Sequence, residues 1–447
     1  MLIRFTVSNF LSFKDETEFN MLTGDVKRHP HHVYKREHIN VLRAAAIYGA
    51  NGAGKSNLIK AIQFLKLIVE GNDILKALPK FGLSKEYLEK PSELEIEIEI
   101  NGIIYAYGLV FDNTRIMEEW LYKVNFEKDD EMIFERETDE KLKHHLKLAS
   151  KYLQTDKSKY YVEFYEETLI NANLTFCSSI QKTKAIEEVN ILVNWFEEDL
   201  VIILPDTKIE SLIRDIYSSK DYSKWFSNIL KTFDTGVENL KIKDIKPNFP
   251  NNEFDDIHEE IQKILVDHPS AFTTFQQGNN YFGATIENEQ ITYKTLVSEH
   301  KGNENQTVSF MLSQESDGTQ RLLDFIPIIN QLQKTATTFI IDEIDRSIHP
   351  SLLKTFLKLL MEIKESKGQI IFTTHESNLL DLDIFRQDEI WFAEKNQEGA
   401  TQFYPLSEFK IRYDLDIRKG YLNGRFGAIP FLGDLEKLNW NNHAETK

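Results

Sequence analysis

The sequence of 447 residues contains a single cysteine, Cys177. One thiol excludes an intrachain disulfide and a zinc site built from several cysteines, and it fits a reducing compartment. A membrane span needs about 18 consecutive apolar residues, and no segment has them. The opening MLIRFTVSNF lacks the uninterrupted apolar core of a signal peptide. We therefore expect a cytoplasmic protein that is neither exported nor inserted into a membrane.

The sequence also lacks an excess of positive charge, a repeat of fixed period and a sustained heptad run. Its formal net charge is -18, which argues against general attraction to nucleic acid, although a local basic face could still bind DNA. Without heptads, a long coiled-coil arm within this chain is excluded. Hydrophobic residues make up 41% of the chain, as in a globular protein, and 447 residues are enough for two or three ordinary domains or for one large unit with an insertion.

The stretch Leu42–Ile59, LRAAAIYGANGAGKSNLI, has the pattern of a short buried strand, a glycine loop and a helix start. It fits G-x-x-x-x-G-K-[ST], in which glycines let the backbone N–H groups face phosphate oxygens at the positive end of a helix. Lys55 then supplies a charge to the β- and γ-phosphates, and Ser56 supplies a hydroxyl to Mg²⁺. The predicted nucleotide-binding residues are Gly49, Ala50, Asn51, Gly52, Ala53, Gly54, Lys55, Ser56 and Asn57.

Two further buried-strand patterns end in polar residues suited to phosphate chemistry. TTFII, residues 337–341, is followed by Asp342 and Glu343, and QIIFTT, residues 369–374, is followed by His375. In a P-loop enzyme the first carboxylate holds Mg²⁺ and the second orients the attacking water. A strand-terminal imidazole could hydrogen-bond the γ-phosphate or that water. We predict Asp342 and Ser56 as metal ligands, and Glu343, His375 and Lys55 as catalytic residues.

A second anion site is predicted at LSQESDGTQRLL, residues 312–323, where Ser316 and Gly318 precede an apolar helical run. A serine at a helix N-cap and the helix dipole both favour an anion. One nucleotide in one chain has little use for two such sites. We therefore expect Ser316 and Gly318 to close over the γ-phosphate held by a second copy of the chain, which makes dimerisation dependent on ATP.

The patterns elsewhere predict a mixed sheet and an insertion. Residues 93–111 alternate as a hairpin with Asn101 and Gly102 at the turn. From about Met132 to Val201 the pattern is helical, and Lys143, Lys147 and Lys151 would then form a basic stripe. Contact with a phosphate backbone is one interpretation of the stripe, and a solvated face is the preferred one.

Residues 27–36, KRHPHHVYKR, combine basic side chains with His29, His31 and His32. A metal site or a nucleic-acid site is conceivable here. The spacing matches no recognised ligand pattern, so a solvated loop is the preferred interpretation.

The order of these motifs resembles the ATP-binding-cassette (ABC) ATPases. Within that class, the chain is similar to the RecF, SMC and OLD-like branch. The similarity lies in the glycine loop, the signature ESDGT, the strand end before DEIDRSIHP and the segment TTHESNLL. The opening FTVSNFLSF and the ending RKGYLNGRFGAIPFL further resemble standalone ATPases of abortive-infection and anti-phage systems of the AbiL/RloA type. The signature departs from the family by placing Asp317 before Gly318, and His349 stands where many cassettes have aspartate. Gln181 is the candidate for the glutamine loop.

The resemblance implies an α/β fold: an ABC-type P-loop ATPase head with a mixed parallel and antiparallel sheet and an inserted, mostly helical lobe. The expected division is residues 1–130 for the N-terminal half of the head, 131–300 for the lobe and 301–447 for the C-terminal half. The cofactors are then ATP and Mg²⁺, and the partners are further copies of the chain and a separately encoded effector, a nuclease or toxin. OLD-like nucleases carry a Toprim domain after the ATPase, whereas 72 of the 447 residues follow His375.

Two other functions fit the sequence. One is a RecF-like ATPase that binds DNA in repair or replication, with the lysine stripe as its contact. The other is a scaffold that holds ATP without hydrolysing it. Binding of DNA at low salt and release of phosphate distinguish these functions from an ATPase switch in phage defence.

Overall fold

The computed structural model divides into two compact units, each described here by itself. The residues that the structure describes are 1–154, 160, 162–169, 171–181, 185–207, 211–246, 253–268, 270–303, 306–411 and 415–429. The first unit comprises Met1–Ile202, Ala336–Ile344 and Lys364–Lys447. The second comprises Ile203–Thr335 and Asp345–Ile363. The last residues of the ending compared above, 430–432, lie outside the described residues.

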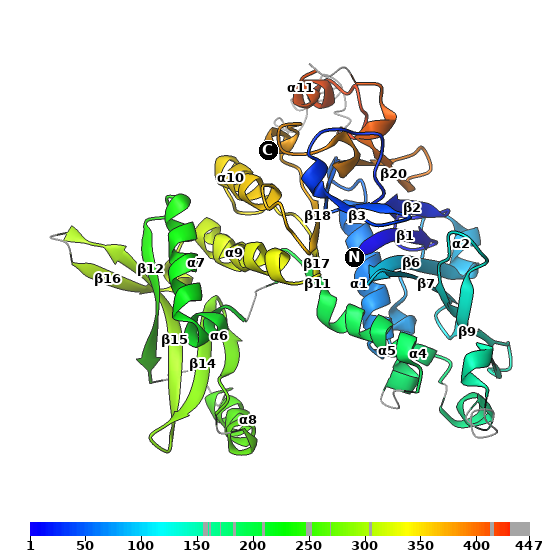
Figure 1. The fold of residues 1–447 in the computed structure, drawn as a ribbon, viewed down its shortest axis with the longest axis horizontal. Coiled ribbons are helices and arrows are strands. Elements are labelled where there is room, and N and C mark those ends of the chain that lie inside the picture. The colour runs from blue at the N-terminus through cyan, green and yellow to red at the C-terminus, as the bar shows by residue number, and fades with distance from the viewer. Residues whose placement is uncertain are drawn as a thin grey trace, which may run out of the picture. The chain divides into compact units, whose positions relative to one another are not determined.

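The first unit contains a seven-stranded antiparallel sheet in the order β10-β9-β8-β7-β6-β1-β2 (Figure 1). Its strands are β1 (Leu2–Ser8), β2 (Thr17–Asn20), β6 (Ser92–Ile100), β7 (Ile103–Phe111), β8 (Ile116–Lys123), β9 (Glu131–Thr138) and β10 (His144–Leu148). The predicted hairpin is confirmed: β6 pairs with β7, and Asn101 and Gly102 have φ values of 52° and 86°. Both residues tolerate the left-handed backbone that a two-residue turn requires.

The core of the first unit is a six-stranded sheet in the order β11-β17-β18-β5-β19-β20. Its strands are β5 (Ala44–Gly49), β11 (Leu200–Ile203), β17 (Thr338–Ile341), β18 (Gln369–Thr373), β19 (Ile390–Lys395) and β20 (Thr401–Pro405). Strand β5 is central, pairs in parallel with β18 and β19, and is buried along its whole length, as its apolar run predicts. The carboxyl ends of β5, β17 and β18 therefore lie at one edge of the sheet, where open α/β sheets bind ligands.

Helices and a small sheet complete the first unit. They are β3 (Val33–Lys35), β4 (Asn40–Leu42), α1 (Lys55–Val69), α2 (Lys85–Glu89), α4 (Phe176–Ile180), α5 (Glu187–Asn194) and α11 (Ile417–Leu422). Gln369 links the two large sheets, because its amide nitrogen donates to the carbonyls of Leu2 and Leu42 and its oxygen accepts from the N–H of Leu2.

The second unit is built on an antiparallel sheet in the order β12-β15-β14-β13, with β16 also paired to β15. Its strands are β12 (Val237–Ile245), β13 (Thr273–Gln277), β14 (Asn280–Glu287), β15 (Gln290–Lys301) and β16 (Thr307–Met311). Its helices are α6 (Ser211–Ser218), α7 (Lys220–Thr232), α8 (Glu253–Asp267), α9 (Asp317–Lys334) and α10 (Pro350–Met361). Ile261 and Leu265 of α8 pack with Ala284 and Tyr293 of the sheet.

The mixed parallel and antiparallel α/β architecture is confirmed, and residues 131–300 contain strands beside the predicted helices. Residues 131–138 and 144–148 extend the antiparallel sheet of the first unit, and β12 to β15 form a sheet of their own. The turn between β14 and β15 uses Asn288 and Glu289 at φ values of 49° and 63°. Glutamate is an uncommon residue in such a turn, so the hairpin pattern is weak there.

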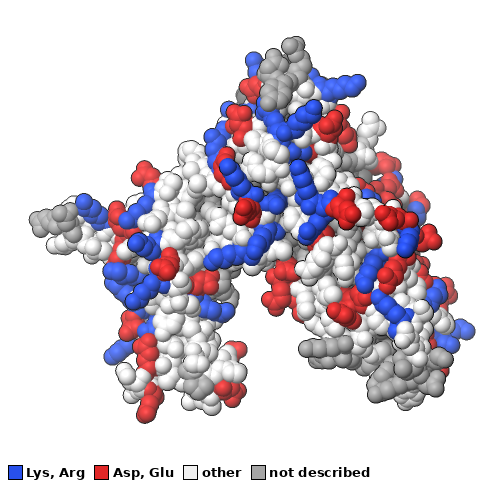
Figure 2. Space-filling view, viewed as in Figure 1, with Lys and Arg blue, Asp and Glu red and all other residues white. Residues whose placement is uncertain are grey.

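The prediction of a lysine stripe is wrong, because it required residues 143–151 to form one helix. Lys147 lies in β10 and its Nζ is 3.0 Å from Glu135, while Lys151 Nζ lies 2.7 Å from Glu188. Burial acts to raise the pKa of Glu188, but hydrogen bonds from Lys123, Lys151 and Tyr152 outweigh it and lower that pKa to about 2. On the face seen in Figure 2, basic and acidic side chains are interspersed over β6 to β9. The feature that favoured DNA contact is therefore absent as a continuous stripe.

A search of the described part of the chain for a helix with the length and apolar character of a bilayer span finds none.

Candidate functional site

The glycine loop joins the end of β5 to the start of α1. Gly54 is the N-cap of α1 with φ 104°, a left-handed conformation that glycine adopts readily. A Cβ on Gly54 would lie 2.0 Å from Thr401 Oγ1, and one on Gly49 would lie 2.5 Å from the carbonyl oxygen of Ala393. Both positions therefore need glycine for space, and Gly54 needs it for backbone conformation as well. The loop ends at a fifteen-residue helix, whose N-terminal N–H groups suit a phosphate.

Lys55 is folded over this loop. It is 5% exposed, and its Nζ donates to the carbonyls of Gly49 at 2.9 Å and Ala50 at 3.2 Å. The same Nζ lies 3.3 Å from Nδ1 of His375, at the end of β18. The fold thus brings together two predicted catalytic residues that are 320 positions apart.

Ser56 and Asp342 also meet, as predicted for a pair of magnesium ligands. Ser56 Oγ donates to Asp342 Oδ1 at 3.0 Å, and Asp342 is 5% exposed at the end of β17. A hydroxyl and a carboxylate oxygen at this separation are the donor types that Mg²⁺ prefers, so the residues present fit the ion. They would hold it beside the phosphate loop.

Thr373, the last residue of β18, is a site residue that the sequence patterns did not reveal. Its Oγ1 donates to Asp342 Oδ1 at 2.6 Å and accepts from the backbone N–H of Glu343 at 2.8 Å. Glu343 has φ 51°, an uncommon conformation for a residue other than glycine, which turns the chain sharply at the end of β17. Thr373 therefore fixes both carboxylate residues at once. Its signal in the sequence was its place just before Thr374 and His375.

Two hydroxyl side chains outside the glycine-loop motif support that loop: Thr401 in β20 and Ser12 in the segment after β1. Thr401 Oγ1 donates to the carbonyl of Ala53 at 2.8 Å and lies 2.7 Å from Ser12 Oγ. Ser12 Oγ accepts from the side-chain amide of Asn57 at 2.7 Å. These contacts join segments that are distant in the sequence, so sequence reasoning did not assign Ser12 and Thr401 to the site.

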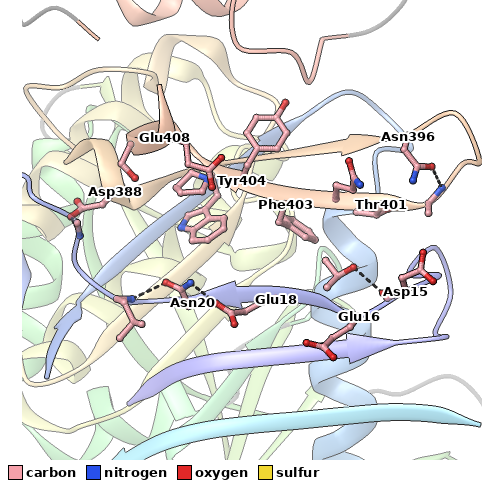
Figure 3. A pocket seen from close by; sticks show the side chains of 18 of the residues that line it. Asp15, Glu16, Glu18, Asn20, Asp388, Asn396, Thr401, Phe403, Tyr404 and Glu408 are labelled. Carbon is pink, nitrogen blue, oxygen red and sulfur yellow. Dashed lines mark hydrogen bonds between the residues drawn. The ribbon is translucent and has the colours of Figure 1, made fainter. Parts of the chain in front are cut away.

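A groove of about 700 Å³ runs between β2 and β20, the edge strands of the two large sheets (Figure 3). Thr401 lines this groove as well as contacting the glycine loop. The groove also carries several carboxylates, including Asp15, Glu18 and Glu408, which repel phosphate. The glycine loop is therefore the better phosphate site in this unit.

The serine–glycine signature lies in the second unit, at the start of α9. Ser316 is its N-cap, and its Oγ accepts from the N–H of Thr319 at 3.2 Å, as the sequence predicts. A Cβ on Gly318 would lie 2.9 Å from the carbonyl oxygen of Ser347. The helix start is thus packed closely against the segment that follows Asp345.

Gln181 and His349 have local partners. Gln181 Nε2 donates to Glu197 Oε1 at 2.7 Å. His349 is the N-cap of α10, and its Nδ1 accepts from the N–H of Ser351 at 3.3 Å. The roles of Gln181 as a glutamine loop and of Ser316 and Gly318 as contacts to a second copy stay predictions.

A phosphate loop after a central parallel strand, with a serine–aspartate pair and an acidic neighbour at the adjacent strand ends, defines an ABC-type P-loop ATPase head. The chain belongs to the family described as "AAA domain, putative AbiEii toxin, Type IV TA system", whose model matches residues 44–144 and 192–381. A comparison with curated protein sequences finds no significant match.

Several solved structures of SMC heads are similar to the chain. An SmcHead bound to the C-winged helix domain of ScpA has 13% identity, covers 90% of this chain and 97% of its own, and has a TM-score of 0.41. The SMC head domain from Thermotoga maritima has 13% identity, coverage of 90% and 98%, and a TM-score of 0.36. A Pyrococcus furiosus Smc head with an extended coiled coil, bound to the C-terminal domain of ScpA, has 12% identity, coverage of 95% and 98%, and a TM-score of 0.37.

Proposed function

We propose that the protein binds ATP with Mg²⁺ and hydrolyses it to ADP and phosphate. The observation that carries this proposal is the convergence of Lys55, Ser56, Asp342 and His375 at one edge of the core sheet, with contacts of 3.0 to 3.3 Å between the chain-distant pairs. These residues supply a cation, a metal site and an imidazole beside a loop of backbone N–H groups, as phosphoryl transfer requires.

In this mechanism the loop 49–57 and the N-terminus of α1 bind the phosphates, and Lys55 exchanges its bonds to Gly49 and Ala50 for phosphate oxygens. Ser56 and Asp342 would hold Mg²⁺, which would supply positive charge to the phosphates. Glu343 orients the attacking water, with its backbone fixed by Thr373. His375, whose Nδ1 lies 3.3 Å from Lys55 Nζ, donates a hydrogen bond to the γ-phosphate or to the water.

The proposal continues with a dimer that forms on ATP. Ser316 and Gly318 of one copy close over the γ-phosphate bound by the other copy, and hydrolysis releases the two. The support is chemical: α9 begins with a capped, glycine-containing turn that suits an anion, while the phosphate loop of the same chain already has its own helix N-terminus.

We further propose that this switch acts in the bacterial cytoplasm and controls a separately encoded nuclease or toxin in anti-phage defence. The support is the family, whose description names a toxin of a toxin–antitoxin system, and the resemblance of the motifs to AbiL/RloA-type ATPases. Co-purification of the untagged chain with the product of the neighbouring gene tests this part. Recovery of the chain alone, with and without ATP, contradicts it.

A phosphate-release assay with ATP and Mg²⁺ tests the proposed reaction. Wild-type protein should release phosphate and lose that activity when EDTA removes Mg²⁺. Glu343→Gln should bind ATP while releasing phosphate at least about 100-fold more slowly, because the amide cannot accept a proton from water. Equal turnover by the two proteins overturns the role of Glu343. ATP binding without release by wild type shows a non-hydrolysing scaffold instead.

A further inference from the structure

Three histidines gather in the segment before β3. His31 and His32 lie in a short 3₁₀ helix (η1, Pro30–His32), and His29 is its N-cap. Side chains three residues apart eclipse in such a helix, and the rings of His29 and His32 accordingly stack with centroids 4.9 Å apart. His31 lies edge-on to His32 at 4.4 Å. One ring nitrogen from each histidine lies within 4.8 Å of the other two.

Acceptor groups orient two of the three rings. Nε2 of His29 lies 2.9 Å from the carbonyl oxygen of Leu382, and Nδ1 of His32 lies 2.9 Å from Glu389 Oε1. The carbonyl oxygen of Leu382 can only accept, so Nε2 of His29 carries the proton and the lone pair is on Nδ1. With the Glu389 carboxylate as acceptor, Nδ1 of His32 donates and the lone pair is on Nε2. Metal-binding histidines are held in this way, by a carbonyl or a carboxylate on the nitrogen that does not bind the metal.

The acceptors are themselves held firmly. Glu389 is fully buried, and its Oε2 accepts from the backbone N–H of Arg386 at 2.8 Å. The Arg386 guanidinium donates twice to Asp388, at 2.9 and 2.7 Å, and Asp388 accepts from the N–H of Gly24 at 2.8 Å. The cation nearest to the histidines in the sequence, Arg28, lies 3.9 Å from Asp383. Carboxylates therefore pair with Arg28 and Arg386, the two arginines that flank the acceptors of the histidines.

We propose that His29, His31 and His32 bind a transition-metal dication of the Zn²⁺ type, with water as the fourth ligand. Imidazole nitrogens are preferred ligands of Zn²⁺, and bonds of 2.0–2.1 Å in a tetrahedron place the nitrogens about 3.4 Å apart. The three nitrogens approach one another by up to about 1.4 Å to reach that geometry. Because the rings of His29 and His32 are within 13° of parallel, one of them turns to direct its lone pair at the ion.

This site is distinct from the nucleotide site. The carbonyl of His32 accepts from the N–H of Arg43, the residue just before β5, whereas the phosphate loop begins at the other end of that strand. Six residues of strand separate the two by about 17 Å. The hydrogen bonds of His29 and His32 already connect the segment after β2 to residues 382–389. The metal therefore stiffens that segment and takes no part in ATP chemistry.

The test uses the untagged full-length chain, stripped with EDTA and dialysed, because an affinity tag of histidines would bind the same ions. Zn²⁺ is titrated against a chromogenic chelator, and Co²⁺ is added separately to record its visible absorption. Wild type should bind one equivalent of Zn²⁺ and give the intense Co²⁺ spectrum of a tetrahedral site. His31→Asn should bind Zn²⁺ at least tenfold more weakly, and Glu389→Gln should fall between the two.

Two matched variants serve as controls. His145→Asn removes an exposed histidine of β10 outside the cluster, and Asp342→Asn removes the predicted Mg²⁺ ligand. Both should keep the tight Zn²⁺ equivalent, and Zn²⁺ should raise the melting temperature of both but not that of His31→Asn. If His31→Asn fails to fold by circular dichroism, His29→Asn takes its place. A wild type that binds no Zn²⁺, or a cluster variant that binds it as tightly as wild type, overturns the proposal.

Discussion

The two ends of β5 differ in how their residues are assembled. At the carboxyl end, the glycine loop and α1 follow the strand directly, so most of the predicted phosphate site comes from one run of nine residues, 49–57. At the amino end, the histidines of residues 29–32 meet acceptors at Leu382 and Glu389, more than 350 positions away. A contiguous motif reveals its chemistry in the sequence, whereas a site assembled by the fold does not.

Lys55→Ala should have the largest effect on the nucleotide site at the carboxyl end of β5 and almost none on the histidine cluster at its amino end. Alanine removes the buried ammonium that would bind the phosphates. The affinity for ATP should therefore fall by roughly 10- to 100-fold, which is the usual contribution of a hydrogen bond from a charged group. Isothermal titration with a slowly hydrolysed ATP analogue measures this. Zn²⁺ affinity of the same variant should stay within twofold of wild type. A parallel loss of both would show that the ends are coupled or that the variant is misfolded.

Thr373→Val should lower the rate of hydrolysis rather than the affinity. Valine keeps the shape of threonine but removes the hydroxyl that bonds both Asp342 and the N–H of Glu343. Outer-shell partners of metal ligands typically contribute 10- to 100-fold, so we expect kcat to fall by roughly that factor. Thr373→Ser, which keeps the hydroxyl, is the control and should retain most of the rate. Equal rates for valine and serine variants would contradict the assignment.

Ser12→Ala should give the smallest effect, a modest loss of stability near the glycine loop. It removes the acceptor for Asn57, and one such hydrogen bond contributes about 1 kcal/mol. The melting temperature should fall by a few degrees, and the stabilisation conferred by ATP should decrease slightly. Thermal denaturation with and without ATP measures both. An unchanged melting temperature would show that Ser12 is not a support of the loop.

The same contrast explains what the sequence could predict. The glycine loop, the hairpin at Asn101 and Gly102, and the strand-end residues Asp342 and His375 follow local patterns whose physical reasons are independent of the rest of the fold. The prediction of helix is wrong at β9 and β10. The spacing of four between Lys143, Lys147 and Lys151 fits a helix, but Lys147 pairs with Glu135 of the neighbouring strand and Lys151 pairs with Glu188 of α5.

Three supporting residues could not be predicted for a different reason. Thr373, Thr401 and Ser12 act through contacts between segments that are distant in sequence, and each is an ordinary hydroxyl residue in its own segment. His32 is similar: its basic, polar neighbours suggested a solvated loop, yet its side chain is 3% exposed and bonded to a fully buried Glu389. Burial of this kind is a property of the tertiary structure.

We propose that a second copy of the chain completes the nucleotide site. The mass of Glu343→Gln in solution, measured by light scattering at one protein concentration without nucleotide and with ATP and Mg²⁺, tests this proposal. We predict that the mass doubles, or rises to a higher multiple, only when ATP is present. Adding Ser316→Arg, which places a bulky side chain at the start of α9, should abolish the increase. A mass that is the same with and without ATP would contradict the claim.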